Sequence, residues 1–295
     1  MKSYFERVVD LLHDHPDSGR YFVDVSNCRL DELSATEMSS LTNQHEIVAG
    51  FRVPERSVST TWVADRFVDA LIAERGIEQA LDTRVLGVKP TTNLAKNDQW
   101  FVETPDGPRG PFEFVINSLW EGRLAVDVTA GMEPHGKWSH RFRFSQYVRT
   151  ADSVDIPSSV IATGPFGDIK NYNGRDFYLS WYPKGLIAEG SAITPPELPS
   201  LDTAATNEIT KSIFDNLELL LPRVSQVRKH AEQMTLAGGW VFAVGQGSLA
   251  DPKATLHSRR DFGIRRNGTY YSVDTGKYST APWLARELAN RICPD

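Results

Sequence analysis

The stretch Tyr270-Tyr271-Ser272-Val273-Asp274-Thr275-Gly276-Lys277-Tyr278-Ser279-Thr280-Ala281-Pro282 carries the strongest structural signal in the sequence. An aromatic and apolar strand leads into a Thr-Gly-Lys turn, and a helix with proline in its first turn follows. The N–H groups and positive dipole at a helix N-terminus favour an anion, and glycine lets a ligand approach the backbone closely. An ordinary capped helix after a hairpin explains the same residues, so a ligand site and a purely structural turn both stay open.

Familiar nucleotide-binding and hydrolase patterns do not cover this turn. Thr275-Gly276-Lys277 lacks the upstream glycine of a P-loop, and no G-x-G-x-x-G occurs in the chain. The pair Gly245 and Gly247 has no third glycine after it. A G-x-S-x-G elbow is also absent from the sequence, so a serine hydrolase has no support.

The composition is that of a globular chain without basic or membrane character. The 295 residues are 40% hydrophobic and 24% charged, which is enough to bury one large core or two modest ones. The net charge of −6 argues against a general nucleic-acid-binding protein, and no apolar run approaches the length of a transmembrane helix. Cys28 and Cys293 form neither a disulfide framework nor a metal-ligand pattern. We therefore expect a cytoplasmic protein that holds no metal and contacts neither nucleic acid nor membrane.

Hydrophobic periodicity predicts helices and antiparallel hairpins in irregular alternation, and hence an α+β or mixed α/β fold with two subdomains. A capping box at Ser34 begins a short helix, and Val63, Phe67 and Leu71 form the clearest apolar stripe. Three hairpin turns are predicted, at Asp106-Gly107, Asn173-Gly174 and Asn267-Gly268. The predicted helices cover 3–15, 35–41, 60–75, 202–220, 222–230 and 281–292. The predicted strands cover 21–25, 47–53, 83–88, 99–103, 112–118, 138–150, 160–163, 177–181, 240–244, 261–264 and 269–273. A tight turn at Gly238-Gly239 leads into the strand at 240–244.

Two further groups of side chains could serve a ligand. His257 lies near Arg259 and Arg260 in a C-terminal block, residues 253–295, that holds eight Lys/Arg against four Asp/Glu. Such a cluster can bind a carboxylate or move a proton, and a structural ion-pair cluster is the alternative. Trp181 and Tyr182 end a predicted hairpin strand and could line a pocket, although core packing is the commoner use of such aromatics. Carbohydrate stacking on the tryptophans is a weaker possibility, the candidates being Trp100, Trp120, Trp138 and Trp181.

Three segments, taken in order along the chain, resemble one known family. Pro54-Glu55 with the following helix and strand is similar to the middle region of the FAD-dependent oxidoreductases of the D-amino-acid-oxidase group, which includes glycine oxidase and glycerol-3-phosphate dehydrogenase. Phe114-Val115-Ile116-Asn117-Ser118-Leu119-Trp120-Glu121-Gly122-Arg123 resembles the strand and turn that contact the flavin nucleotide in that family. The block at 251–289, which contains the Thr275-Gly276-Lys277 turn, resembles the family's C-terminal end.

The resemblance implies a mixed α/β fold with a three-layer FAD-binding-type domain and a substrate domain built on an antiparallel sheet. It implies a discontinuous FAD-binding-like domain at 43–135 and 236–295, a substrate domain at 136–235 and a helical lead-in at 1–42. The implied activity is oxidation of a small amine or hydroxyl substrate by hydride transfer to FAD.

The resemblance also implies roles for the candidate residues. His257, Arg259 and Arg260 become candidates for orienting an anionic small-molecule substrate, with Trp181 and Tyr182 in its pocket. The implied cofactor contacts are Asn117, Thr275, Gly276, Lys277, Tyr278, Ser279 and Thr280.

The sequence departs from the family pattern in two places. Asn117-Ser118-Leu119-Trp120 replaces the usual small-residue turn, and the family's opening strand, glycine loop and helix, which bind the FAD diphosphate, are not recognised. We expect a portion of a longer enzyme; a divergent protein without tight FAD binding, or a missing unit supplied by another chain, are the alternatives. The competing function is therefore a non-catalytic binding or interaction protein that retains the fold.

Overall fold

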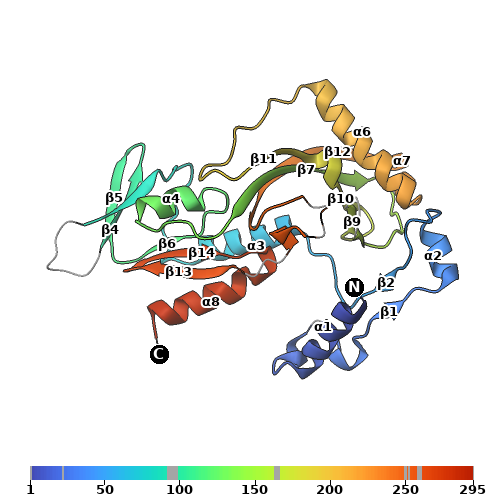
Figure 1. Cartoon of the computed structure of the whole chain (residues 1–295), viewed down its shortest axis with the longest axis horizontal. Helices are drawn as coiled ribbons and strands as arrows, with labels where there is room; N and C mark the ends of the chain where they lie inside the picture. Colours follow the sequence, from blue (N-terminus) through green and yellow to red (C-terminus); the bar gives the residue numbers. More distant parts are fainter. Residues whose placement is uncertain are drawn as a thin grey trace.

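The computed structural model describes residues 2–21, 23–91, 99–162, 167–248, 251, 253–257 and 261–294, and for residue 257 it describes the backbone alone. The chain has a mixed α/β fold, and its largest element is a six-stranded antiparallel sheet (Figure 1). This confirms the mixed α/β class and the large antiparallel sheet expected from the sequence. No helix in the described part of the chain is long and apolar enough to cross a membrane.

The six-stranded sheet is built around β7 (Trp138–Thr150), which occupies the residues predicted for it. The other strands are β8 (Ser159–Ile161), β9 (Gly167–Asn171), β10 (Asp176–Trp181), β11 (Leu186–Gly190) and β12 (Ala231–Val244). β7 pairs with β10, β11 and β12, and β9 and β8 extend the sheet beyond β10. The turn predicted at Asn173-Gly174 is confirmed, because it joins β9 to β10 and Gly174 has φ +83°.

Two helices, α6 (Thr203–Leu220) and α7 (Val224–Lys229), cover one face of this sheet (Figure 1). The Asp202 side chain caps α6 by accepting a hydrogen bond from the Ala205 N–H at 2.7 Å. Apolar side chains at helical spacing then face the sheet and form the main hydrophobic core. The fully buried members are Ile169, Phe177, Leu179, Ile213, Phe214, Leu217, Val224 and Val227.

A smaller sheet contains the strand that begins the Tyr270–Pro282 stretch. Its strands, in spatial order, are β13 (Gly263–Asn267), β14 (Tyr270–Asp274) and β6 (Val115–Asn117). β13 and β14 form the predicted hairpin, whereas β14 and β6 run parallel. Two helices follow these strands, α4 (Arg123–Thr129) after β6 and α8 (Ala281–Ile292) after β14, and α8 packs on Tyr271 and Val273 of β14.

A third sheet of three strands lies beside α4 and packs on it through Val88 and Trp100. Asp106-Gly107 forms the predicted tight turn between its last two strands. The strands are β3 (Gly87–Pro90), β4 (Trp100–Thr104) and β5 (Gly107–Phe112).

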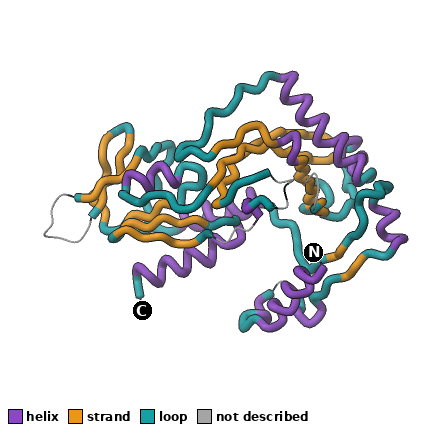
Figure 2. Tube along the Cα trace, viewed as in Figure 1, coloured by secondary structure: helices purple, strands orange, loops and turns teal. Residues whose placement is uncertain are grey.

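The chain before residue 60 forms short elements joined by loops at the edge of the molecule (Figure 2). They are α1 (Lys2–Asp14), β1 (Asp31–Glu32), α2 (Ala35–Leu41) and β2 (Phe51–Arg52). The capping box predicted for α2 is confirmed, since the Ser34 hydroxyl accepts from the Glu37 N–H and the Glu37 carboxylate accepts from the Ser34 N–H.

Several predictions of local structure are wrong. The strand predicted at 83–88 is displaced to β3, which begins at Gly87. The tight turn expected at Gly238-Gly239 is absent, because both residues lie within β12 and pair with β7. No strand forms at the described residues of the predicted 21–25 strand (21 and 23–25), because the Asp24 carboxylate accepts from Ser26 and nucleates a 3₁₀ turn at Val25–Asn27. The strand predicted at 47–53 is reduced to β2. The helix predicted at 60–75 is confirmed as α3 (Thr60–Ala73), but its apolar stripe does not reach a core, since none of the helix's side chains is buried in the described structure.

The predicted domain boundaries stay a prediction. β12 crosses the boundary placed at residue 236, because its strand begins at Ala231 and pairs with β7 along its whole length.

Candidate functional site

The carboxyl ends of β6 and β14 meet at one edge of their sheet. The two strands are parallel, with Asn117 opposite Ser272, so the turns that follow them leave the sheet on the same side. Ligands of open α/β sheets bind outside the carboxyl ends of the parallel strands. The structure thus brings together Asn117 and the 275–280 segment, which are far apart in the sequence.

The turn after β14 is closed by its own side chains. Gly276 has φ +61°, a conformation that favours glycine, and its N–H donates to Asp274 Oδ1 at 2.8 Å. The Thr280 hydroxyl donates to the Lys277 carbonyl at 2.7 Å and also to the Thr275 carbonyl. The side chains of Lys277, Tyr278 and Ser279 are exposed, which leaves one cation at the N-terminal end of α8.

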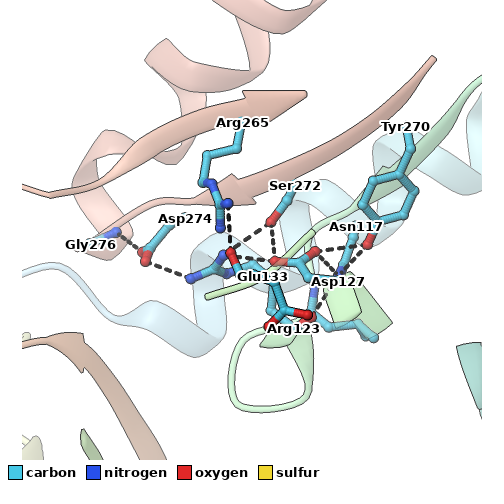
Figure 3. A network of polar contacts seen from close by, with 10 residues as sticks. Asn117, Arg123, Asp127, Glu133, Arg265, Tyr270, Ser272, Asp274 and Gly276 are labelled. Atoms are coloured by element: carbon cyan, nitrogen blue, oxygen red, sulfur yellow. Dashed lines mark hydrogen bonds and ion pairs between the residues drawn. The ribbon is translucent and has the colours of Figure 1, made fainter. Parts of the chain in front are cut away.

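Asn117 is buried in a polar network rather than exposed at this edge (Figure 3). Its Nδ2 donates to the Arg123 carbonyl at 2.9 Å, to Asp127 Oδ1 at 2.9 Å and to the Tyr270 hydroxyl at 2.8 Å. Its Oδ1 accepts from the Leu119 N–H at 3.1 Å, which fixes the start of the turn after β6. The side chain of Asn117 therefore holds β6, α4 and β14 together.

Arg123 is the cation of this network and contacts two carboxylates. Its Nη1 lies 3.2 Å from Asp127 Oδ2 and 3.0 Å from the Ser272 hydroxyl, and its Nη2 lies 2.8 Å from Asp274 Oδ2. The guanidinium also lies over the ring of Phe242 of β12, 5.1 Å from the ring centroid. Arg123 thereby joins the small sheet to the large one.

Asp127 accepts hydrogen bonds from four side chains and is fully buried. One donor is the Tyr270 hydroxyl, at 2.8 Å. Burial, followed by the charge of Asp127, raises the pKa of the Tyr270 phenol well above its ordinary value, so this hydroxyl keeps its proton and remains a donor.

The network reaches the glycine turn through Asp274. Arg123 holds one oxygen of this carboxylate, and the other oxygen accepts the Gly276 N–H. A buried ion pair on α4 therefore sets the position of the turn after β14 (Figure 3). No sequence pattern assigns a role to Arg123, Asp127 or Asp274; the one local signal is the spacing of four between Arg123 and Asp127, typical of an ion pair on a helix.

Trp181 and Tyr182 point to opposite faces of the large sheet. Trp181 is only 6% exposed and belongs to the core beneath α6, where a Cβ on Gly167 would lie 2.7 Å from its ring. Tyr182 is half-buried at the start of α5 (Tyr182–Gly185), and its ring stacks on the Arg143 guanidinium at 3.5 Å. Trp181 thus has the core role named as its alternative, and a pocket role for Tyr182 stays a prediction.

The predicted cluster of His257, Arg259 and Arg260 is not tested. Arg259 and Arg260 lie outside the described residues, and only the backbone of His257, in a 3₁₀ turn at Thr255–His257, is described. No group of three or more His, Cys, Asp or Glu side chains that could hold a metal ion occurs among the residues that the structure describes.

No protein-family model matches the sequence, and no curated protein is significantly similar to it. Solved structures do match. Glycine oxidase from Geobacillus kaustophilus superposes with a TM-score of 0.62 at 14% identity, over 97% of this chain and 67% of its own. L-proline dehydrogenase from P. horikoshii gives a TM-score of 0.61 at 13% identity, over 98% and 77% of the two chains. L-alpha-glycerophosphate oxidase from Mycoplasma pneumoniae with FAD bound gives 0.55 at 16% identity, over 97% and 70%.

These likenesses establish the fold over nearly the whole chain. It is the fold of the FAD-dependent oxidoreductases of the D-amino-acid-oxidase group, so the resemblance seen in the sequence is confirmed at the level of the fold. At these identities the likeness extends to the fold alone.

Proposed function

We propose that this chain is an FAD-dependent oxidoreductase, or a portion of one, that oxidises a small amine or hydroxyl substrate. The observation that carries the proposal is the edge where β6 and β14 end, with a glycine turn, an exposed lysine and the start of α8 at one place. The fold shared with an FAD-bound oxidase supports it. In this proposal the two three-stranded sheets, one of β3, β4 and β5 and the other of β13, β14 and β6, belong with their helices to a three-layer FAD-binding domain. The six-stranded sheet is the substrate domain.

The residues at this edge fit the flavin end of the cofactor. A backbone turn with positive φ, a helix N-terminus and the Lys277 cation all favour an anionic or electron-rich group beside them. Phe262 lies behind Gly276, so a Cβ on this residue would meet the Phe262 side chain at 3.0 Å. Among the described residues, β6 and β14 are the parallel strands of this sheet, and neither leads into a G-x-G-x-x-G turn that could hold the diphosphate.

When bound, the flavin would supply the acceptor for a hydride from the substrate C–H bond. The residues of this chain would position the flavin and stabilise its edge. The 275–280 segment would hold the flavin edge with backbone N–H groups and Lys277, and the Arg123–Asp274 pair would keep that turn in place. His257, Arg259 and Arg260 stay candidates for orienting an anionic substrate.

Titration of FAD with the purified chain tests the proposal, with flavin fluorescence anisotropy as the readout. We expect micromolar or tighter binding, and a loss of affinity of about tenfold or more in Gly276→Val, because a β-branched residue strains the left-handed turn. Lys277→Ala should weaken binding by removing the exposed cation, whereas Lys184→Ala on α5 is a matched control that should bind normally.

Oxidase or dehydrogenase activity has its own readout. Anaerobic addition of small amines, amino acids or hydroxy acids should bleach the flavin absorbance of the FAD-loaded chain. A chain that binds no FAD at any accessible concentration would contradict the proposal. It would favour instead a binding or interaction protein that keeps the fold without the cofactor.

A further inference from the structure

Trp120 is a large side chain in the turn between β6 and α4, where the family pattern has small residues. The turn begins at the edge where β6 ends, and the Asn117 side chain fixes its start by accepting the Leu119 N–H. Ser118 and Leu119 are exposed, whereas Trp120 is half-buried. The indole of Trp120 therefore packs on another part of the chain.

The packing partner of Trp120 is β12 of the large sheet. The indole Nε1 donates a hydrogen bond to the Trp240 carbonyl at 2.8 Å. The indole ring lies edge-on to the Phe242 ring, with the ring centroids 6.2 Å apart and an interplanar angle of 76°. Aromatic pairs prefer edge-to-face contact at such a distance, so the direction of the ring is fixed as well as its position. One side chain thus makes a polar and an aromatic contact with the same strand.

Phe242 extends this contact to the central strand of the large sheet. It is 1% exposed, is paired with His140 of β7 across the strands, and its ring centroid lies 5.3 Å from that of His140. The Arg123 guanidinium lies 5.1 Å from the centroid of the same Phe242 ring. Trp120 and Arg123, which flank the end of one turn, therefore both contact a single buried ring of β12.

The same turn is bound to the edge where β6 and β14 end. Asn117 Nδ2 donates to the Arg123 carbonyl at 2.9 Å. Arg123 Nη2 holds one oxygen of Asp274, whose other oxygen accepts the Gly276 N–H. Since β6 and β12 belong to different sheets, the contacts of this turn with β12 are made by its side chains. Residues 117–123 therefore connect the glycine turn with the large sheet.

We propose that Trp120 is a positioning residue, whose indole holds the turn after β6 against β12 and so sets the large sheet relative to the edge where the flavin would lie. This rests on the proposed function, in which flavin and substrate domain face each other. Hydride transfer requires the reacting atoms to be held close together, so the two parts need a constant relative position. Without the indole, the turn occupies several positions, and only a fraction of them is competent.

The distance between two spin labels tests this role on the full chain without FAD. One label is placed on the exposed Cys293 after α8, and the other on Lys229→Cys at the end of α7. The chain also carries Cys28→Ala, so that two thiols remain. Pulsed electron–electron double resonance reports the distribution of distances between the labels. We expect a narrow distribution in this parent chain and a broader or shifted one in Trp120→Ala.

The matched control is a second indole that donates to a main-chain carbonyl. Trp138 Nε1 donates to the Ala192 carbonyl at 3.0 Å, so Trp138→Phe removes a hydrogen bond of the same kind outside the turn and should leave the label distances unchanged. Trp120→Phe keeps a ring against Phe242 and loses the donor, so its distribution should lie between those of the parent and Trp120→Ala. Circular dichroism checks folding, and if Trp120→Ala does not fold, the comparison of Trp120→Phe with Trp138→Phe decides.

The FAD titration of the preceding subsection gives a second readout. We expect Trp120→Ala to raise the Kd for FAD about threefold or more, because a smaller fraction of the molecules holds the turn in the competent position. Trp138→Phe should leave this Kd unchanged. A residue that only stabilised the fold would lower the free energy of unfolding without changing the label distances or the Kd.

Two results would overturn the positioning role: unchanged label distances in Trp120→Ala and Trp120→Phe, or equal changes in Trp120→Phe and Trp138→Phe. The two proposals fail in different ways. A chain that binds no FAD rejects the proposed function, while the label distances still decide whether Trp120 holds the two sheets in position. Normal FAD binding with unchanged label distances rejects the role of Trp120 and keeps the cofactor.

Discussion

At the scale of single residues, Arg123 is the side chain on which the buried network depends. It neutralises Asp127 and Asp274, both of which are almost completely buried. A buried pair adds little net stability, but removal of one partner leaves an uncompensated charge in a low-dielectric environment. In Arg123→Met two carboxylates would lose their cation at once.

We therefore expect Arg123→Met to lower the free energy of unfolding by about 3–5 kcal/mol. Arg265→Met is the matched control, because Arg265 is more exposed and donates to the Glu133 carbonyl on the surface, and its replacement should cost less than about 0.5 kcal/mol. Urea unfolding followed by tryptophan fluorescence measures both. Equal losses in the two variants would contradict a central role for Arg123.

Asp168 gives a pH dependence at the same scale. Its folded pKa is raised above the unfolded value of about 3.9, so the folded protein holds this proton more tightly, and stability falls as pH rises from about 4 through the folded pKa. Lys170 and Arg143 are the charged groups that face it. Asp168→Asn removes this loss. The stability of the variant minus that of the unsubstituted chain should therefore be larger at pH 7 than at pH 4. A thermal-unfolding difference that is the same at both pH values, or larger at pH 4, would be inconsistent with a raised pKa.

At the scale of elements, α6 stabilises the large sheet by one face only. Ile213 is fully buried against the sheet, whereas Leu219, six residues later on the same helix, is 59% exposed. Ile213→Ala should cost about 2–5 kcal/mol, since it removes buried methyl groups and leaves a cavity. Leu219→Ala should change stability by less than about 0.5 kcal/mol. Chemical unfolding of the two variants measures the difference in free energy of unfolding. Comparable losses in both would contradict the packing of α6 on the sheet through the face that carries Ile213.

At the scale of the whole molecule, α3 behaves as a surface element despite its apolar sequence. Phe67 is 55% exposed, and none of the helix's described side chains is buried. Phe67→Gln should therefore change the free energy of unfolding by less than about 0.5 kcal/mol and should reduce self-association in light scattering. Leu284→Gln on α8, where the side chain is buried, should be strongly destabilising in the same assay. A large loss of stability in Phe67→Gln would mean that α3 packs on other parts of the chain.

The sequence by itself determined the elements whose signals are local. The helix α8 begins and ends where Pro282 and the hydrophobic spacing predict, the capping box at Ser34 starts α2, and β7 occupies 138–150. Capping hydrogen bonds, turn residues and side-chain alternation act between residues a few positions apart, so they can be recognised without the fold. The family resemblance added the overall fold, and the likeness to solved structures confirms it.

Only the tertiary structure decided which residues meet. Asn117 and Tyr270 are 153 positions apart yet share a hydrogen bond, because β6 and β14 pair in parallel, and no local pattern encodes that register. The same holds for Trp181 and Tyr182, which are adjacent in sequence, although Trp181 packs in the core beneath α6 and Tyr182 begins α5 and stacks on Arg143. The apolar stripe of α3 correctly predicted a helix, but no side chain of that helix is buried in the described structure, since periodicity reports that a face is apolar and not what covers it. Local interactions set the elements of this protein, and long-range pairing between strands set its candidate sites.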